Sequence, residues 1–183
     1  MTKSTIVIPN YNGINYIQAC LESLYSGTAK DLEIVVVDNA STDGSMELVR
    51  DQFPKVRLIV NEKNMGFSHA VNQGIRVSAT PYVILLNNDT RADFSFVHEL
   101  EKVMDNDTHK KLFSASAKLV SLYDKDKTDD AGDYYCALGW AFARGKGKPP
   151  SQYDKDCEIF ASCAGAAIYR RELLEETKVG LFD

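Results

Sequence analysis

The fold is indicated most directly by the stretch Tyr82-Val83-Ile84-Leu85-Leu86-Asn87-Asn88-Asp89, in which five apolar residues stop at three polar ones. A continuous apolar run, as opposed to an alternating one, is typical of a strand that is buried on both faces of a parallel sheet. A carboxylate directly after such a strand, here Asp89, needs a hydrogen-bond donor or a cation to offset its desolvation.

Three similar runs precede this one, and amphipathic segments separate them. The earlier strands are predicted at Ile6-Val7-Ile8, Ile34-Val35-Val36-Val37 and Val56 to Val60. Helical spacing of apolar residues begins near Ile14, after Ser41-Thr42-Asp43, at Phe67 and at about Asp93. Residues 4 to about 105 are therefore predicted to form a β-α-β-α-β-α-β unit, an α/β fold with an open, mostly parallel sheet flanked by helices.

The second half of the chain has a less regular pattern. A strand is predicted within residues 113–122, and a short helix is predicted to begin at Arg170. Between them lie a charged loop at 124–130, a Gly/Pro-rich turn at 145–150 and a small, apolar segment at 159–168.

Composition and net charge exclude some classes of function. The chain has 183 residues with 44% hydrophobic and 26% charged residues, which is typical of a globular domain. Its net charge of −5 argues against a nucleic-acid partner, which would need a basic face. The four cysteines lack the spacing of a zinc site, which favours free thiols in a reducing compartment. The expected location is the cytoplasm, and peripheral attachment to the inner face of a membrane stays open.

Polar residues gather where the predicted strands end. Ligands of open α/β sheets bind beyond the carboxyl ends of the strands. The four ends carry Pro9-Asn10-Tyr11-Asn12, Asp38 to Asp43, Asn61 to Asn64, and Asn87-Asn88-Asp89. Turn and cap roles explain several of these residues equally well, but fit Asp38 and Asp89 poorly.

Together these polar strand ends form what we call the rim. Known phosphate-binding signatures do not account for it. No Gly-x-Gly-x-x-Gly follows the first strand, and Gly145-Lys146-Gly147-Lys148 lacks the spacing of a P-loop. A pyrimidine could instead stack on Tyr11 and donate its N3–H to Asp38. Asp89 could hold Mg²⁺ or Mn²⁺ between two phosphates, because these ions prefer oxygen ligands.

Five stretches together resemble glycosyltransferase family 2, a GT-A-fold group that includes many bacterial rhamnosyltransferase-like enzymes. They are Ile6 to Gly13, Val35 to Ser45, Asn64 to Ser68 with Asn72-Gln73-Gly74, Leu85 to Thr90, and Ala164 to Arg171. They cover nearly the whole chain. The resemblance implies a single GT-A domain over 1–183, with a nucleotide-binding half at 1–105 and an acceptor-side half at 106–183.

The resemblance also implies roles by position. Pro9, Tyr11 and Asn12 would line the nucleoside pocket, and Asp38 would read the base. Asn64, Gly66, Phe67 and Asn72 would shape the pocket wall. Asn87, Asn88 and Asp89 stand where the family has its Asp-x-Asp motif, with Asp89 as the metal ligand for Mg²⁺ or Mn²⁺. Gly165 and Ala166 would lie on the acceptor side, and Asp129 to Gly132 would lie in the variable acceptor-facing region.

One departure from the family pattern concerns catalysis. The general base of the family lies in an acidic segment beyond the position that matches Gly180-Leu181-Phe182-Asp183. The resemblance therefore implies a chain truncated before its base, with Asp183 matching only the residue that opens that segment.

The expected reaction is an inverting transfer of sugar from a dTDP-, UDP- or GDP-sugar. The acceptor would be a hydroxyl of a carbohydrate or lipid-linked saccharide, as in bacterial cell-surface polysaccharide synthesis. The alternative is a non-catalytic domain or fragment that binds nucleotide sugar. A sugar nucleotidyltransferase is disfavoured because Asn10-Tyr11-Asn12-Gly13 is not a Gly-rich, basic loop. The oligomeric state stays open.

Overall fold

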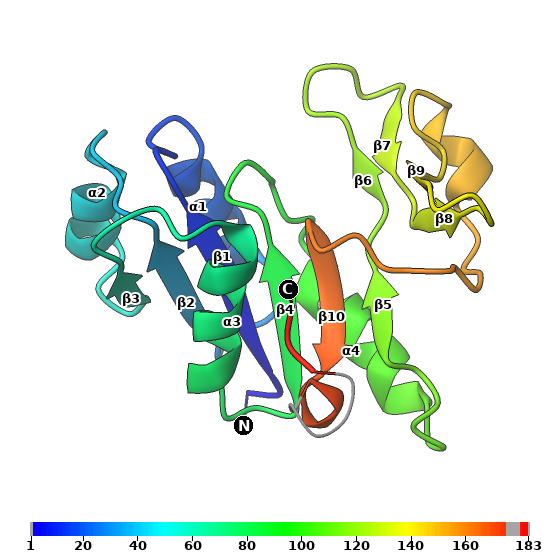
Figure 1. Cartoon of the computed structure of the whole chain (residues 1–183), viewed down its shortest axis with the longest axis horizontal. Coiled ribbons are helices and arrows are strands. Elements are labelled where there is room, and N and C mark those ends of the chain that lie inside the picture. Colours follow the sequence, from blue (N-terminus) through cyan, green and yellow to red (C-terminus); the bar gives the residue numbers. More distant parts are fainter. Residues whose placement is uncertain (1, 175–179, 183) are drawn as a thin grey trace.

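A mixed sheet forms the centre of the molecule in the computed structural model, which describes residues 2–174 and 180–182 (Figure 1). Within these residues the strand order is β3-β2-β1-β4-β10-β5. The bounds are β1 (Ser4–Asn10), β2 (Glu33–Asp38), β3 (Arg57–Val60), β4 (Tyr82–Leu86), β5 (Ser114–Ser116) and β10 (Ala166–Arg170). Strands β1 to β4 run parallel, as the sequence predicts, and β10 is antiparallel to both of its neighbours.

Helices cover both faces of this sheet. They are α1 (Ile17–Ser26), α2 (Ser45–Gln52), α3 (Phe67–Val77) and α4 (Phe96–Asn106). One buried cluster joins Ile6 and Ile84 of the sheet to α1, α2 and α4. A second joins Val7 and Leu85, which point the other way, to α3. The prediction that these strands are buried on both faces is therefore confirmed for β1, β2 and β4.

Strand β3 differs from the other parallel strands. It lies at the edge of the sheet and pairs with β2, so its side chains are less enclosed and Val60 is 47% exposed. Apolar runs in the sequence do not separate an edge strand from a central one.

Close packing of α3 on β1 depends on Gly74. A Cβ at this position would lie 2.3 Å from Cγ1 of Val7, a separation that real Cβ atoms do not reach. The absence of a side chain lets α3 settle onto the strand that ends in the polar rim.

Helices α1, α2 and α4 begin later than the sequence predicts, whereas α3 begins at Phe67 as predicted. Helix α2 begins at Ser45 because Gly44 takes a left-handed conformation with φ of 88° just before it. Helix α1 begins at Ile17, after a turn in which the amides of Tyr16 and Ile17 donate to the Gly13 carbonyl. Within the described residues, no helix is long and apolar enough to cross a bilayer.

The second half adds small two-stranded sheets beside the main one (Figure 1). They pair β6 (Leu119–Val120) with β7 (Thr128–Asp130), and β8 (Asp133–Tyr135) with β9 (Ala141–Ala143). The single strand predicted within 113–122 is confirmed only in part, because this range holds two strands, β5 paired with β10 and β6 paired with β7. Short 3-10 helices occupy Pro150–Tyr153 and Arg171–Leu173. The second begins one residue after the predicted helix start, because Arg170 is the last residue of β10.

Candidate active site

The carboxyl ends of the parallel strands meet at one edge of the sheet. Asn10 at the end of β1 is in register with Asp38 at the end of β2, and β4 ends beside them at Leu86. In Figure 1 the arrowheads of β1, β2 and β4 point to this edge, where β10 begins. The sequence-predicted polar loops are thus neighbours in space.

Asn10 ties three of these loops together from a buried position, being only 2% exposed. Its Nδ2 donates to Asp38 Oδ2 at 2.7 Å and to Ser45 Oγ at 2.9 Å. Its Oδ1 accepts from Asn88 Nδ2 at 2.7 Å. Sequence reasoning assigned Asn10 no role, although an amide that ends a buried strand needs partners on several sides.

Asp38 is fully enclosed, with 0% of its surface exposed. Its Oδ1 accepts the Ser41 amide at 2.8 Å, and its Oδ2 accepts Asn10 Nδ2 and the Ser41 hydroxyl, the latter at 2.6 Å. Neutral donors therefore offset its desolvation. The carboxylate is enclosed by these donors, and the role of Asp38 in reading a nucleobase stays a prediction.

The loops after β1 and β2 are bonded to each other. Asn12, at a φ of 50°, donates its amide to Ser41 Oγ at 2.9 Å and accepts the Thr42 amide on Oδ1 at 2.9 Å. Asp43 accepts the Ile14 amide at 2.8 Å. Burial disfavours ionisation of Asp43, but hydrogen bonds from Ser45 and Ile14 outweigh it and hold its pKa below the usual range.

Gly13 packs under this junction. A Cβ there would lie 2.3 Å from Asn10 Oδ1 and 2.3 Å from Asn88 Nδ2, so any side chain would displace the Asn10–Asn88 hydrogen bond. In the sequence Gly13 is only one residue of a motif. The need for a glycine there is not visible, because Asn88, one of the two residues that a Cβ would meet, lies 75 positions away.

Tyr11 and Asp89 are the exposed members of the predicted site. Tyr11 is 52% exposed, and its ring is free for stacking. Asp89 is exposed, and no hydrogen bond or ion pair from the described residues reaches it. Beside it, a hydrogen bond with Tyr123 raises the pKa of Tyr16, and the Asp89 charge adds to this effect.

Asp89 is the one carboxylate of the Asn87-Asn88-Asp89 segment, and it is exposed. Across the described chain, no group of three or more His, Cys, Asp or Glu side chains is arranged to hold a metal ion. Mg²⁺ and Mn²⁺ commonly take one or two carboxylates and complete their shell with substrate phosphates and water. Asp89 fits that mode, but it does not form a metal site of protein ligands alone.

A buried thiol supports the loop that carries Asp89. Cys20 Sγ lies 3.7 Å from the Asn87 carbonyl oxygen and 3.9 Å from Thr90 Oγ1. Burial raises the pKa of this thiol to about 12, so it stays protonated at neutral pH. The Thr90 hydroxyl also donates to the Asn87 carbonyl at 2.7 Å, which closes the turn.

Gly165 and Ala166, the predicted acceptor-side residues, adjoin this loop. The Asn87 amide donates to the Gly165 carbonyl at 2.9 Å, and Ala166 pairs with Leu86 in the sheet. Ala166 is buried, so it shapes this end of the site through its backbone. Nearby Asp130 is 5% exposed, and burial raises its pKa.

The predicted pocket wall lies at the start of α3. A cavity of about 390 Å³ is lined by Met65, Gly66, Phe67, Ser68, His69, Asn72 and Phe182. Asn64 does not line it; its Oδ1 accepts the Gly66 amide at 2.9 Å and shapes the turn before the helix. Asn39 Nδ2 donates to the Gly66 carbonyl at 3.1 Å, which links this wall to the end of β2.

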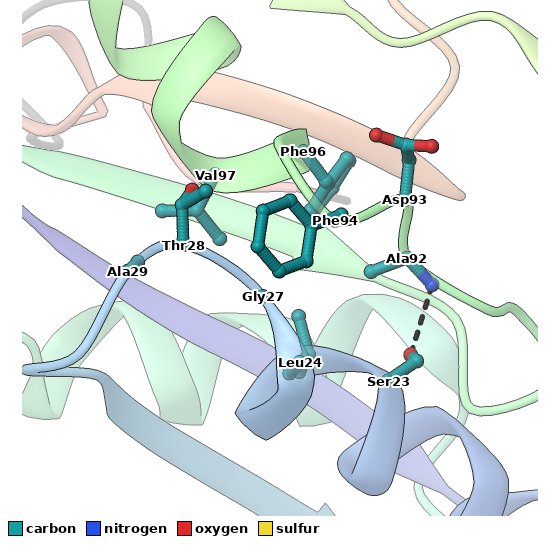
Figure 2. Close-up of a pocket in the computed structure, with 10 residues that line it drawn as sticks. All are labelled: Ser23, Leu24, Gly27, Thr28, Ala29, Ala92, Asp93, Phe94, Phe96 and Val97. Carbon is teal, nitrogen blue, oxygen red and sulfur yellow. Dashed lines mark hydrogen bonds between the residues drawn. The ribbon is translucent and has the colours of Figure 1, made fainter.

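A second hollow lies away from the rim, between the end of α1 and the segment before α4. Figure 2 shows its lining, with the Ser23 hydroxyl accepting the Ala92 amide at 2.9 Å. Its volume of about 10 Å³ is that of a single water, so it is too small for a sugar or a nucleotide.

The sheet, its covering helices and its polar rim together define a GT-A glycosyltransferase fold. The solved mannosyltransferase PcManGT from Pyrobaculum calidifontis, in complex with GDP-Man and Mn²⁺, superposes with a TM-score of 0.68 at 22% identity. S. aureus TarS in complex with UDP-GlcNAc gives a TM-score of 0.69 at 19% identity. These matches cover 99% and 96% of this chain, and 47% of each solved chain.

The chain belongs to glycosyl transferase family 2, which matches residues 5–178. Among curated relatives, the teichoic acid poly(glycerol phosphate) polymerase of Staphylococcus epidermidis is 33% identical over 112 residues. That match covers 58% of this chain and 16% of the polymerase. The expectations of a GT-A fold and of family membership are confirmed.

Proposed function

We propose that the rim binds a nucleotide-diphosphate sugar and that the reaction it serves is inverting glycosyl transfer to a hydroxyl acceptor. The observation that carries the proposal is the position of exposed Tyr11 and Asp89 on loops that the buried Asn10 network holds together. An aromatic face and a carboxylate on one rim suit the two ends of such a donor, its base and its diphosphate.

Each residue then has a distinct task. Tyr11 stacks on the base, while Asp38 positions the loops after β1 and β2 through Asn10 and Ser41. Asp89 holds Mg²⁺ or Mn²⁺ together with the diphosphate. When bound, the cation would stabilise negative charge on the departing diphosphate.

The chemistry is a single displacement. The acceptor oxygen forms a bond to the anomeric carbon, the bond from that carbon to the diphosphate breaks, and the hydroxyl proton passes to a carboxylate base. Attack from the face opposite the leaving group inverts the configuration. The family base is expected beyond Asp183, a residue that lies outside the described part of the chain. Gly165 and Ala166 border the acceptor side.

Relatives support the donor class and the pathway. The two solved neighbours were obtained with GDP-Man and Mn²⁺ and with UDP-GlcNAc. The named role of the polymerase relative in teichoic acid supports synthesis of a bacterial cell-surface polymer, with a carbohydrate or lipid-linked acceptor. Four free cysteines agree with a cytoplasmic location, at the inner face of the membrane where the acceptor is lipid-linked.

Calorimetric titration with UDP-GlcNAc, dTDP-rhamnose and GDP-mannose, each with Mn²⁺, tests donor binding. We expect saturable binding of one of the three, and absence of binding to all would contradict the proposal. Release of free sugar from the bound donor, or its transfer, then separates an enzyme from a non-catalytic nucleotide-sugar-binding domain.

A further inference from the structure

Asn72 makes a contact that its place in the sequence does not suggest. It is 9% exposed in the middle of α3, and both ends of its amide bind one residue 110 positions away. Its Nδ2 donates to the Phe182 carbonyl at 2.6 Å, and its Oδ1 accepts the Phe182 amide at 3.0 Å. A side-chain amide that satisfies both main-chain groups of one residue fixes that residue as a neighbouring strand would.

The ring of Phe182 packs on the main sheet. It meets the Tyr169 ring of β10 edge to face, with centroids 5.6 Å apart and planes at 89°. Leu181 and Phe182 both pack on the buried cluster beneath α3. In Figure 1 the red segment that contains them runs between α3 and β10.

Phe182 also lines the cavity at the start of α3, together with Gly66 and Phe67. The wall of this cavity therefore comes from two segments that are distant in the sequence. Asn72 lines the same cavity and bonds to the second segment. The two hydrogen bonds to Phe182 use one N–H of Asn72 and one lone pair of its Oδ1, and they orient the amide toward Phe182.

We propose that Asn72 is a positioning residue of the donor site, which fixes the main chain of Phe182 so that its ring completes the cavity wall. This inference rests on the proposed function, because it takes the cavity as part of the nucleotide-sugar site. Asn72 acts on the donor through Phe182 and not by touching it.

The test combines amide exchange with a double-mutant cycle. Exchange of the Phe182 amide is measured by NMR without ligand, in the wild type and in Asn72→Ala. Kd is measured for whichever of UDP-GlcNAc, dTDP-rhamnose or GDP-mannose the wild type binds, with Mn²⁺, in both proteins, in Phe182→Ala and in the double variant. Ser78→Ala is the matched control, because it removes a buried hydrogen bond of 2.7 Å to the Gly74 carbonyl at the far end of α3.

We expect Asn72→Ala to speed exchange of the Phe182 amide by about 10-fold or more and to weaken donor binding by about 3- to 10-fold, the range of one or two hydrogen bonds. Phe182→Ala should weaken binding to a similar extent. The double variant should bind no more weakly than Phe182→Ala, since the path through Phe182 is already lost. Ser78→Ala should leave both readouts at wild-type values.

Two results would overturn the inference while the proposed function stands. One is an unchanged exchange rate of the Phe182 amide in Asn72→Ala. The other is a double variant in which the two effects on Kd multiply, because Asn72 would then contact the donor independently of Phe182. A wild-type chain that binds none of the three donors would instead overturn the proposed function and the donor-site role of Asn72 with it.

Discussion

Asp38 is the last residue of the buried strand β2 and Asp89 lies three residues after the last residue of the buried strand β4, and their surroundings are opposite. Asp38 is enclosed and accepts hydrogen bonds from Asn10 and Ser41, whereas Asp89 is exposed and has no such partner among the described residues. The predicted need for a partner is confirmed for Asp38, whereas the exposed Asp89 has no desolvation to offset. The sequence pattern does not distinguish them, because the donors that satisfy Asp38 come in part from another strand end.

Asp38→Asn tests whether this buried carboxylate is structural. The side chain of this variant has one oxygen, which can accept from the Ser41 amide or from Asn10 Nδ2. Its NH₂ group then faces the other of these two donors and cannot accept from it. We expect the free energy of unfolding to fall by about 1–3 kcal/mol, the cost of leaving buried donors unsatisfied. Urea denaturation followed by circular dichroism measures it.

Asp51→Asn is the matched control for this experiment, because Asp51 is exposed on α2 and makes no ion pair or hydrogen bond within the described chain. Its stability should equal that of the wild type. An Asp38→Asn variant as stable as the control would show that the network around Asp38 contributes little.

Cys20 gives a second prediction for a single residue. Burial raises its pKa from 9.0 to about 12, so the native thiol should not react with a thiol reagent at pH 8, whereas exposed Cys157 should react quickly. The unfolded thiol ionises near pH 9 while the native one does not. Stability from this group is therefore complete below about pH 9 and is lost as pH rises toward about 12.

Mass spectrometry after labelling identifies which thiols have reacted. All four should react in urea. Rapid labelling of Cys20 in the native protein would contradict its burial beneath the Asn87–Thr90 turn.

Among the elements, the helices and the parallel strands follow from the sequence, whereas β10 and the two- and three-residue strands do not. Strands β1, β2 and β4 and helices α1 to α4 have apolar runs or helical spacing that predicts their type. Strands β6 to β9 have two or three residues each, too few for any period to appear. Helices α1 and α2 begin later than predicted, because a turn at Gly13 and a positive φ at Gly44 depend on local backbone geometry.

The contact of α3 with β1 can be tested through Gly74. In Gly74→Ala the new Cβ would meet Val7 Cγ1 at 2.3 Å, an overpacking that costs about 1–3 kcal/mol, offset by about 1 kcal/mol of helix propensity. We expect a net loss of stability. Val7→Ala removes the methyl groups in the way, so the double variant should lose about 1 kcal/mol less than the sum of the two single losses.

Chemical denaturation of the four proteins completes this cycle. Additive losses in the double variant would mean that α3 already stands far enough from β1 to accept a side chain at position 74.

At the scale of the whole molecule, topology explains why the site was partly predictable. Parallel strands bring their carboxyl ends to one edge, so the sequence placed Tyr11, Asp38 and Asp89 near one another before any contact was known. The family resemblance added the pocket wall and the acceptor side. Neither indicated that Asn10 joins the loops or that Asn72 holds Phe182, because these contacts connect residues that are 28 to 110 positions apart.

The proposed function requires that Asp89 bind a divalent cation together with a nucleotide-sugar diphosphate at this rim. The most direct measurement is the Kd of UDP-GlcNAc, dTDP-rhamnose or GDP-mannose, whichever the wild type binds, with and without Mn²⁺, in the wild type and in Asp89→Asn. We expect Mn²⁺ to tighten binding to the wild type and to have no effect on Asp89→Asn. An equal gain from Mn²⁺ in both proteins would contradict it.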